Sequence, residues 1–372
     1  MGYYETITRY RDFDFNKALN AVLADHVRMA VNGEGLDADQ FLSLLSPAAE
    51  CYLEEMAEKA HEITLRNFGR TIQLYTPMYL SNHCENECVY CGFSAKNDIE
   101  RRMLTLGEVG SEAESIASTG LKHILVLTGE SRKMSPPGYI KDCIKVLKRY
   151  FSSIAIEIYP LTEDEYREAV AEGVDGLTIY QEVYDEDIYY AMHPGGPKRD
   201  YNFRLDAPER GSRAGMRSVN LGVLLGLDDW RREVFLMGLH AKYLQDRHPE
   251  AEIGISLPRL RPHSGSFNAP YSVKDRDIVR MILALRLFLP RLGITISTRE
   301  DPAFRENLIG LGVTRMSAGS TTVVGGRTAA RRGDAHPSQF EILDWRSVEE
   351  IKKVLESKGY QGVLKDWMRL EK

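Results

Sequence analysis

The chain has 372 residues, of which 43% are hydrophobic and 27% are charged, and its formal net charge at pH 7 is −6. This length fits one large α/β barrel or two medium-sized domains, and the composition is that of an ordinary globular protein. The acidic balance argues against general nucleic-acid binding, which requires a basic surface. No apolar run approaches the roughly 18 residues that a membrane span requires, so we expect no membrane association.

The amino-terminal stretch MGYYETITRYRDF is charged and aromatic, unlike a secretory signal. The chain contains five cysteines, an odd number, and three of them fall within one short stretch. This distribution does not suggest a disulfide framework. We therefore expect the protein to function in a reducing, cytoplasmic environment.

Residues 1–68 are predicted to form a helical extension that precedes the main domain. Residues 15–32 and 38–45 carry apolar side chains at helical spacing, and Ser46-Pro47 begins a longer helix that continues through Leu65. After this extension the pattern changes to short β-rich runs that alternate with amphipathic segments.

Eight strands are predicted, over residues 72–80, 123–127, 154–159, 176–180, 219–225, 253–257, 294–297 and 315–317. Helical patterns lie between most of them, for example over residues 139–150, 163–172, 230–245 and 275–289. Strands separated by helices imply parallel pairing through right-handed crossovers, and eight such units over about 250 residues match a (β/α)8 TIM-type barrel.

We predict the barrel for residues 69–320, although a partly open barrel would show the same alternation. Residues 321–372 are predicted to be a short extension, with a Gly/Arg-rich loop, one helix over residues 348–358 and a tail.

The stretch LSNHCENECVYCGF directly follows the first strand and contains Cys84, Cys88 and Cys91. Thiolates of so short a loop can converge on adjacent irons of one cluster. Three ligands leave one iron of a four-iron cube without a cysteine, and an open position is typical of a catalytic metal site.

A structural zinc site, in a binding module without catalytic activity, is the alternative. It would need a fourth ligand, for which His83, Cys51 and Cys143 are the candidates. Both distant cysteines lie in predicted amphipathic helices, where a free cysteine behaves as a small apolar residue.

The cysteine spacing, Tyr90 before the third cysteine and the position after the first barrel strand together resemble the radical S-adenosylmethionine (SAM) superfamily. The resemblance implies a [4Fe–4S] cluster whose open iron chelates SAM, and an electron transfer that releases a 5′-deoxyadenosyl radical. In LVLTGES, Gly129 and Glu130 match the Gly-Gly-Glu segment that contacts the SAM amino group, with Thr128 in place of the first glycine.

The resemblance implies further contacts with SAM. Glu157, in IEIYP, matches a carboxylate that holds the SAM ribose, and a carboxylate can accept two hydroxyl hydrogen bonds. Tyr90, Glu182 and Arg204 are expected as additional cofactor contacts. His193, in MHPGGPK, is predicted either as a site residue or as a helix-end cap.

Longer motifs in the middle of the chain, among them YQEVYDEDIYYAMHPGGPKRDYNFRLDAPERGSRAG, LGVLLGL, SLPRLRP, STRED and SAGS, resemble the aromatic amino-acid lyase branch of this superfamily. Hydrogenase-maturase members of the branch carry a second cluster on a cysteine-bearing carboxy-terminal extension, whereas no cysteine follows Cys143 here. The tail GVLKDWMRLEK is similar to the ending of the 2-iminoacetate synthases, with Met368 where an acid is commoner.

The resemblance implies cleavage of tyrosine between Cα and Cβ into 2-iminoacetate and p-cresol, with the imine supplied to the thiazole ring of thiamine. Tryptophan lysis, and tyrosine lysis of the maturase type without the second cluster, are the alternatives. Because the imine hydrolyses in water, the resemblance implies a thiazole synthase partner nearby. It also implies an electron donor such as flavodoxin or ferredoxin.

An amino-acid substrate needs its carboxylate fixed, and the planar fork of arginine does this best. Arg299 follows the seventh predicted strand, and Arg259 and Arg261 follow the sixth, so all three lie at the end of the barrel where active sites form. The resemblance makes Arg299 the first choice, with Ser317 near the end of the eighth strand as an accessory donor.

Overall fold

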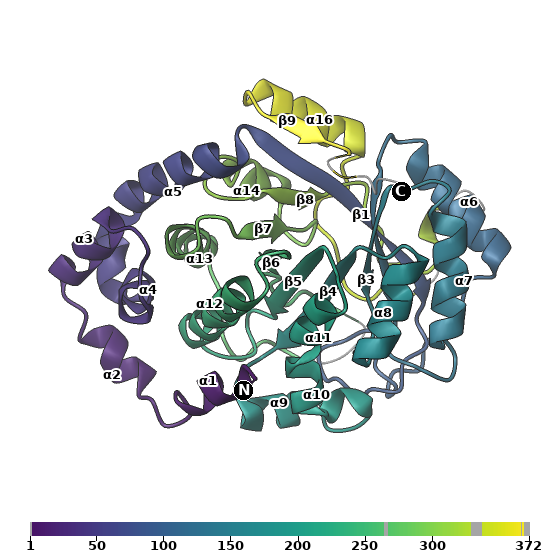
Figure 1. Ribbon diagram of the computed structural model, residues 1–372, viewed down its shortest axis with the longest axis horizontal. Helices are drawn as coiled ribbons and strands as arrows, with labels where there is room; N and C mark the ends of the chain where they lie inside the picture. Colours follow the sequence, from purple (N-terminus) through teal and green to yellow (C-terminus); the bar gives the residue numbers. More distant parts are fainter. Residues whose placement is uncertain (1, 264–266, 329–336, 366, 368–372) are drawn as a thin grey trace.

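The computed structural model describes residues 2–263, 267–328, 337–365 and 367. Its centre is a closed barrel of eight parallel strands in which β1 pairs with both β2 and β8 (Figure 1). The strands are β1 (Thr71–Ser81), β2 (His123–Thr128), β3 (Ser153–Glu157), β4 (Gly176–Glu182), β5 (Ser218–Val223), β6 (Glu252–Ser256), β7 (Gly293–Ile296) and β8 (Arg315–Ser317). The predicted (β/α)8 barrel is confirmed, and each strand lies within two residues of its predicted bounds.

Helices surround the barrel as the alternating pattern predicts (Figure 1). Several of them begin at side-chain caps. Thr162 accepts a hydrogen bond from the Glu165 amide at the start of α8, and Asp229 accepts one from the Arg231 amide at the start of α12. The outer ring contains α6 (Leu106–Ala117), α7 (Pro137–Leu147), α8 (Glu163–Glu172), α11 (Ala207–Arg213), α12 (Trp230–Arg247), α13 (Asp275–Phe288) and α14 (Pro302–Asn307).

The connection after β4 contains short helical elements in addition to α11. It contains α9 (Glu186–Met192), the 3₁₀ helix η2 (Pro197–Arg199) and α10 (Tyr201–Leu205). Two predicted site residues, His193 and Arg204, lie in this connection. No helix in the described ranges is long and apolar enough to cross a membrane.

The amino-terminal segment folds into short helices, and two of its predicted helices are divided. They are α1 (Tyr4–Thr8), α2 (Phe15–Asn20), α3 (Ala24–Asn32), α4 (Ala38–Leu45), η1 (Pro47–Tyr52) and α5 (Leu53–Phe68). The break between α2 and α3 arises because the Leu23 amide donates to Nδ1 of His26 and so begins a new helix. Val27 and Val31 of this new helix, α3, are buried.

These helices form an arc against the outer side of α12 and α13 (Figure 1). The ring of Phe41 in α4 stacks on Phe288 of α13, with 4.2 Å between ring centroids. Gly238 of α12 makes this approach possible, since a Cβ there would lie 2.5 Å from the Phe41 ring. The extension thus supports the barrel wall that carries β5 to β7.

The carboxy-terminal segment adds a strand that the sequence patterns do not predict. After α16 (Val348–Ser357), β9 (Gln361–Val363) pairs in parallel with the first residues of β1. The predicted divisions at residues 68 and 320 stay a prediction. Of the tail motif, Met368 lies outside the described residues.

A buried ion pair fastens the segment before α16 to the barrel. Arg305 of α14 contacts Asp344, and their side chains are only 1% and 0% exposed. Asp344→Ala should lower the free energy of unfolding by about 3–5 kcal/mol, because it leaves a buried guanidinium uncompensated. Urea unfolding would measure the change. Glu349→Ala, which removes an exposed pair with Lys352, is the matched control and should leave stability unchanged. Equal stability of the two variants would contradict this account.

Candidate active site

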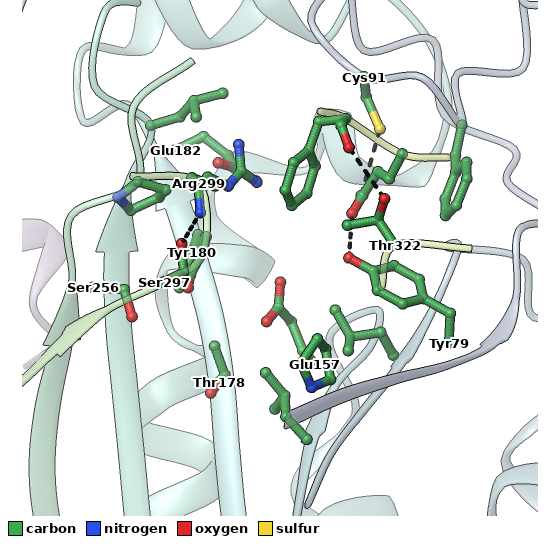
Figure 2. A pocket seen from close by; sticks show the side chains of 18 of the residues that line it. Tyr79, Cys91, Glu157, Thr178, Tyr180, Glu182, Ser256, Ser297, Arg299 and Thr322 are labelled. Atoms are coloured by element: carbon green, nitrogen blue, oxygen red, sulfur yellow. Dashed lines mark hydrogen bonds between the residues drawn. The ribbon is translucent and has the colours of Figure 1, made fainter. Parts of the chain in front are cut away.

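One cavity at the carboxyl ends of the strands brings the predicted site residues together. It contains about 1530 Å³ of space not filled by protein atoms, and Figure 2 shows part of its wall. Most of the residues predicted for cluster, cofactor or substrate line it: Cys84, Cys88, Tyr90, Cys91, Gly129, Glu130, Glu157, Glu182, Arg204, Arg261, Arg299 and Ser317. Arg259 and His193 are not among its lining residues. This placement agrees with a site at the productive end of the barrel, while the role of each residue stays a prediction.

The cysteine loop follows β1 and holds its three thiols free, facing the cavity. Backbone contacts fix the loop: the Glu85 amide donates to the Glu130 carbonyl at 3.0 Å, and the Glu87 amide to the Gly195 carbonyl at 3.0 Å. In the described part of the chain, no three His, Cys, Asp or Glu side chains gather closely enough for a single metal ion. The three cysteines line the same cavity, as ligands to different irons of one cluster would.

The zinc alternative lacks its fourth ligand. Cys51 is exposed in η1 and Cys143 is buried in α7, so both lie in other parts of the fold. His83 is in the loop but does not line the cavity. The geometry favours a cluster with an open position over a closed structural site.

The end of β2 lies against the cysteine loop so closely that only glycine fits. A Cβ at Gly129 would lie 2.3 Å from the His83 carbonyl oxygen. Beside it, the Thr128 hydroxyl faces the cavity, buried and without a hydrogen-bond partner among the described residues. A buried hydroxyl normally has a partner. The orphaned hydroxyl fits a polar cofactor group at the position where the resemblance places the SAM amino group.

Glu130 is held by hydrogen bonds from two residues whose contact with it the sequence patterns did not predict. Arg204 Nη1 lies 2.7 Å from Glu130 Oε1, and Asn86 Nδ2 donates to Oε2 at 2.8 Å. Burial alone would raise the pKa of Glu130, but Arg204 and Lys198 bring it below its usual value. Glu130 is therefore an ionised acceptor in a fixed orientation.

Glu182 ends β4 at an irregularity and forms a second buried pair. Its φ is +71°, a conformation that side-chain-bearing residues rarely adopt and that concentrates at functional sites. Lys198 Nζ lies 2.6 Å from Glu182 Oε1. Burial and the neighbouring Arg204 would lower the pKa of Lys198, yet the charge of Glu182 raises it above its usual value.

Tyr90 and His193 form a buried hydrogen bond of 2.7 Å, from the tyrosine hydroxyl to Nε2. Nδ1 of His193 lies 2.7 Å from the Tyr189 carbonyl, so Nδ1 carries the proton and Nε2 accepts. Burial, together with Lys198, lowers the pKa of His193 to about 2, which keeps the ring neutral. His193 is also the C-cap of α9, which is one of its two predicted roles, while its role as a site residue stays a prediction.

Glu157 points into the middle of the cavity without a protein partner (Figure 2). Among the described residues, none donates a hydrogen bond to its carboxylate or lies within ion-pair distance of it. Burial and the charge of Glu182 raise the pKa of Glu157 to about 7, although Arg299 opposes the shift. The carboxylate is thus available to a ligand, and its charge changes near neutral pH.

The three candidate arginines differ in their partners. Arg259 contacts Glu300 and Asp275, and Arg261 lies 3.1 Å from Glu300. Arg299 forms no ion pair within the described ranges. Its guanidinium lies 3.4 Å from the centre of the Phe340 ring, and it donates only to the Arg259 carbonyl at 3.4 Å. Arg299 is therefore the candidate whose fork is free for a carboxylate.

Ser317 is less free than its prediction supposed. Its hydroxyl oxygen accepts a hydrogen bond from the Thr298 amide at 3.0 Å, and it interacts with the Tyr75 hydroxyl. A hydroxyl has one donor and two acceptor positions. Ser317 therefore mainly fixes the strand ends around Arg299.

Several cavity residues were missed from sequence. Asn86 lies in the cysteine loop and Lys198 in the quoted MHPGGPK motif, so both stood beside recognised residues. Gln339 and Phe340 come from a stretch without any motif. Gln339 connects two cavity residues. Its Oε1 accepts a hydrogen bond from the Tyr79 hydroxyl at 2.7 Å, and its Nε2 lies 3.7 Å from the sulfur of Cys91.

Models of two protein families match the chain. The Radical SAM superfamily matches residues 78–237, which span β1 to α12, and the Biotin and Thiamin Synthesis associated domain matches residues 256–361. Among solved structures, the [FeFe]-hydrogenase maturase HydG has a TM-score of 0.84 and 33% identity, over 96% of this chain and 78% of that chain. Methylornithine synthase has a TM-score of 0.73 at 19% identity, over 91% of this chain and 97% of that one, and so shares the fold.

Curated relatives match almost from end to end. The 2-iminoacetate synthase of Escherichia coli (strain K12) is 38% identical over 365 residues, covering 96% of both chains. That of Salmonella typhimurium is 37% identical over 95% of this chain and 93% of its own. By this similarity the chain belongs to the radical SAM superfamily and, within it, to the family of the 2-iminoacetate synthases.

Proposed function

We propose that this chain cleaves L-tyrosine between Cα and Cβ to 2-iminoacetate and p-cresol. The observation that carries the proposal is the free guanidinium of Arg299 in the same cavity as three free thiols. An amino acid bound by its carboxylate to Arg299 would lie in the cavity where the cofactor residues are also found.

A [4Fe–4S] cluster and SAM are the cofactors of this family, and together they supply a 5′-deoxyadenosyl radical that removes one hydrogen atom from the substrate. Cys84, Cys88 and Cys91 are the residues that would hold the cluster. Thr128 and Glu130 would bind the SAM amino group, Glu130 in the orientation that Arg204 and Asn86 give it.

Glu157, Tyr90 and Glu182 are the remaining cofactor residues. Glu157 would accept hydrogen bonds from the ribose hydroxyls, since it has no partner in the protein. Tyr90 donates its proton to His193, so its hydroxyl oxygen presents only acceptor positions to a ligand. Glu182 orients Lys198, and the pair closes the wall beneath the cysteine loop.

On the substrate side, Arg299 would hold the tyrosine carboxylate through two parallel hydrogen bonds. The Phe340 ring lies over the guanidinium and holds its planar fork in one orientation. With the carboxylate fixed, the amino group of the substrate is held in one position, from which the radical can remove one hydrogen atom.

We further propose a thiazole synthase as the protein that consumes the imine, and flavodoxin or ferredoxin as the electron donor. The free, cavity-facing cysteines suit a reducing, cytoplasmic environment, because oxidation would destroy the ligand set.

Anaerobic incubation with SAM, a reductant and tyrosine tests the reaction. The proposal expects p-cresol, glyoxylate from hydrolysis of the imine, and 5′-deoxyadenosine. Tryptophan in place of tyrosine should give no aromatic cleavage product. If an indole product formed and p-cresol did not, the chain would be assigned tryptophan lysis in place of tyrosine lysis.

The cluster assignment predicts about four irons and four sulfides per chain after reconstitution. Cys84→Ala, Cys88→Ala and Cys91→Ala should each lose the cluster, its broad visible absorption and SAM cleavage. Cys143→Ala, which removes a thiol in α7, is the control and should keep the full iron content. Loss of iron from the control would overturn the ligand assignment.

The pKa of about 7 for Glu157 makes SAM binding depend on pH. The ionised carboxylate accepts hydrogen bonds and the protonated one accepts fewer, so affinity should rise with pH. Between pH 6 and pH 8 the increase should be about tenfold, in proportion to the ionised fraction. Anaerobic titration calorimetry would measure it, and Glu157→Gln should bind weakly and equally at both pH values. The same slope in variant and wild type would assign the titration to another group.

Arg299→Lys should separate radical formation from substrate cleavage. An ammonium lacks the planar fork, and a shift of about 1 Å at the reacting atom costs roughly a hundredfold in rate. The variant should still form 5′-deoxyadenosine slowly while p-cresol falls much further. Arg259→Lys is the control, because Arg259 is already paired with Glu300 and Asp275. An unchanged ratio of p-cresol to 5′-deoxyadenosine in Arg299→Lys would shift the role to Arg261.

A further inference from the structure

Residues 338–343, which we call the return segment, pack against the cysteine loop at the wall of the active-site cavity. The Gly92 amide, next to Cys91, donates to the Gln339 carbonyl at 3.2 Å. A Cβ at Gly92 would lie 2.5 Å from that carbonyl oxygen, so a side chain there would force the two segments apart. The residue after the third cysteine is thus fixed directly to the return segment.

The return segment is held to the barrel by its backbone. The amides of Glu341 and Leu343 donate to carbonyl groups that follow β6 and β7, at 3.0 and 2.9 Å. The Thr322 hydroxyl donates to the Phe340 carbonyl at 3.1 Å. These bonds do not use the side chain of Gln339, so that side chain can be changed without releasing the segment.

The side chain of Gln339 lies between Tyr79 of β1 and the cysteine loop. Its Oε1 accepts a hydrogen bond from the Tyr79 hydroxyl at 2.7 Å, and its Nε2 donates to Sγ of Cys91 at 3.7 Å. Tyr79 is 4% exposed, and its ring packs edge-on against Phe93. Figure 2 shows Tyr79 and Cys91 with dashed lines that mark the hydrogen bonds reaching them. A buried hydroxyl therefore holds one end of the amide, and the cysteine sulfur lies at the other.

The chemistry of the two neighbours determines which way the Gln339 amide points. An amide has a carbonyl end that accepts hydrogen bonds and an amino end that donates them. A thiolate bound to iron has acceptor positions only, so it attracts the amino end. The Tyr79 hydroxyl can donate, so it suits the carbonyl end. The reverse orientation would place two acceptors, oxygen and sulfur, against each other.

Other donors to the cysteine sulfurs are backbone amides. The Phe93 amide donates to Cys91, and the amides of Asn86 and Glu130 donate to Cys84. Backbone donors follow from the shape of the loop, and a substitution does not remove them. Gln339 instead supplies a donor that depends on one side chain, 248 residues away from Cys91 along the chain.

A hydrogen bond to a ligand sulfur changes how easily a cluster is reduced. Reduction adds one negative charge to the cluster and its ligands, and an N–H group pointing at a ligand sulfur stabilises that charge. Such bonds are among the factors that set the reduction potential of an iron–sulfur cluster. The effect is strong in buried surroundings, because water screens the interaction less there.

We propose that Gln339 raises the reduction potential of the cluster through its hydrogen bond to the Cys91 sulfur. The proposal rests on the cluster ligands of the proposed function and not on its substrate. The electron comes from the flavodoxin or ferredoxin donor and passes to the sulfonium of SAM, whose bond to the 5′ carbon then breaks. Gln339 acts through Cys91, as a positioning residue, and brings the cluster within the range of that donor.

The test compares midpoint potentials of reconstituted protein without SAM or tyrosine, by anaerobic redox titration followed by electron paramagnetic resonance. Gln339→Leu keeps about the same volume and removes the donor. At a given applied potential its ratio of reduced to oxidised cluster should fall about tenfold, which corresponds to a potential about 59 mV lower. Gln339→Glu keeps the shape but places a carboxylate beside the sulfur, so its potential should fall further.

Thr322→Val is the matched control. It removes a hydroxyl from the wall of the same cavity, and the partner of that hydroxyl is the Phe340 carbonyl instead of a sulfur. Its potential and iron content should equal those of the wild type. An unchanged potential in both Gln339 variants, or an equal fall in Thr322→Val, would overturn the proposal. So would loss of iron from both Gln339 variants alone, since Gln339 would then only support the loop.

The choice of reductant provides a second measurement. With reduced flavodoxin, Gln339→Leu should form 5′-deoxyadenosine about tenfold more slowly than the wild type, because less of its cluster is reduced. Excess titanium(III) citrate, a stronger reductant, should restore the wild-type rate. Equal slowing with both reductants would place the defect in SAM binding and overturn the proposal. A wild-type protein that holds no cluster would instead refute the proposed function.

Discussion

The site depends on the close contact between the cysteine loop and two other barrel loops. Two backbone amides of the loop, those of Glu85 and Glu87, find their partners outside it, in Glu130 after β2 and in Gly195 after α9. The contact is so tight that a side chain is excluded at two positions. Gly129 lies against His83, and Gly196, with φ of +91°, lies against Asn86. The placement of the thiols thus follows from glycine residues elsewhere in the chain.

Asn86 joins this contact to the buried charges. Its side-chain amide donates to Glu130, and its carbonyl oxygen accepts from the Lys198 amide at 2.7 Å. Glu130 is paired with Arg204 and Glu182 with Lys198, so each acid next to the cluster loop is neutralised. Buried charges without partners are costly. Glu157 and Arg299 depart from this rule, and these two groups face the open part of the cavity, where a ligand would supply the missing partners.

The same reasoning applies to the centre of the barrel. Layers of apolar side chains would make the barrel more stable, yet hydroxyl, amide and guanidinium groups line its interior from Thr295 to Arg315. The outer shell compensates: Phe41 and Phe288 stack, and Arg305 and Asp344 form a fully buried pair.

The sequence alone determined the barrel and its ligand loop, because both are local patterns. Strand and helix periodicity follow from which side chains face the core, and three thiols within one loop are close in any fold. Glu130 and Glu157 were also accessible, since each follows a strand end and all such ends meet at one face of the barrel.

Only the tertiary structure decided what depends on contacts between distant segments. Three arginines follow β6 and β7, and only their partners show that Arg299 is free while Arg259 and Arg261 are paired with Glu300. Gln339 and Phe340 reach the cavity because β9 and the ion pair of Asp344 return the end of the chain to the barrel. No spacing along the chain encodes these pairings, because they arise from side chains that meet only after the barrel has closed.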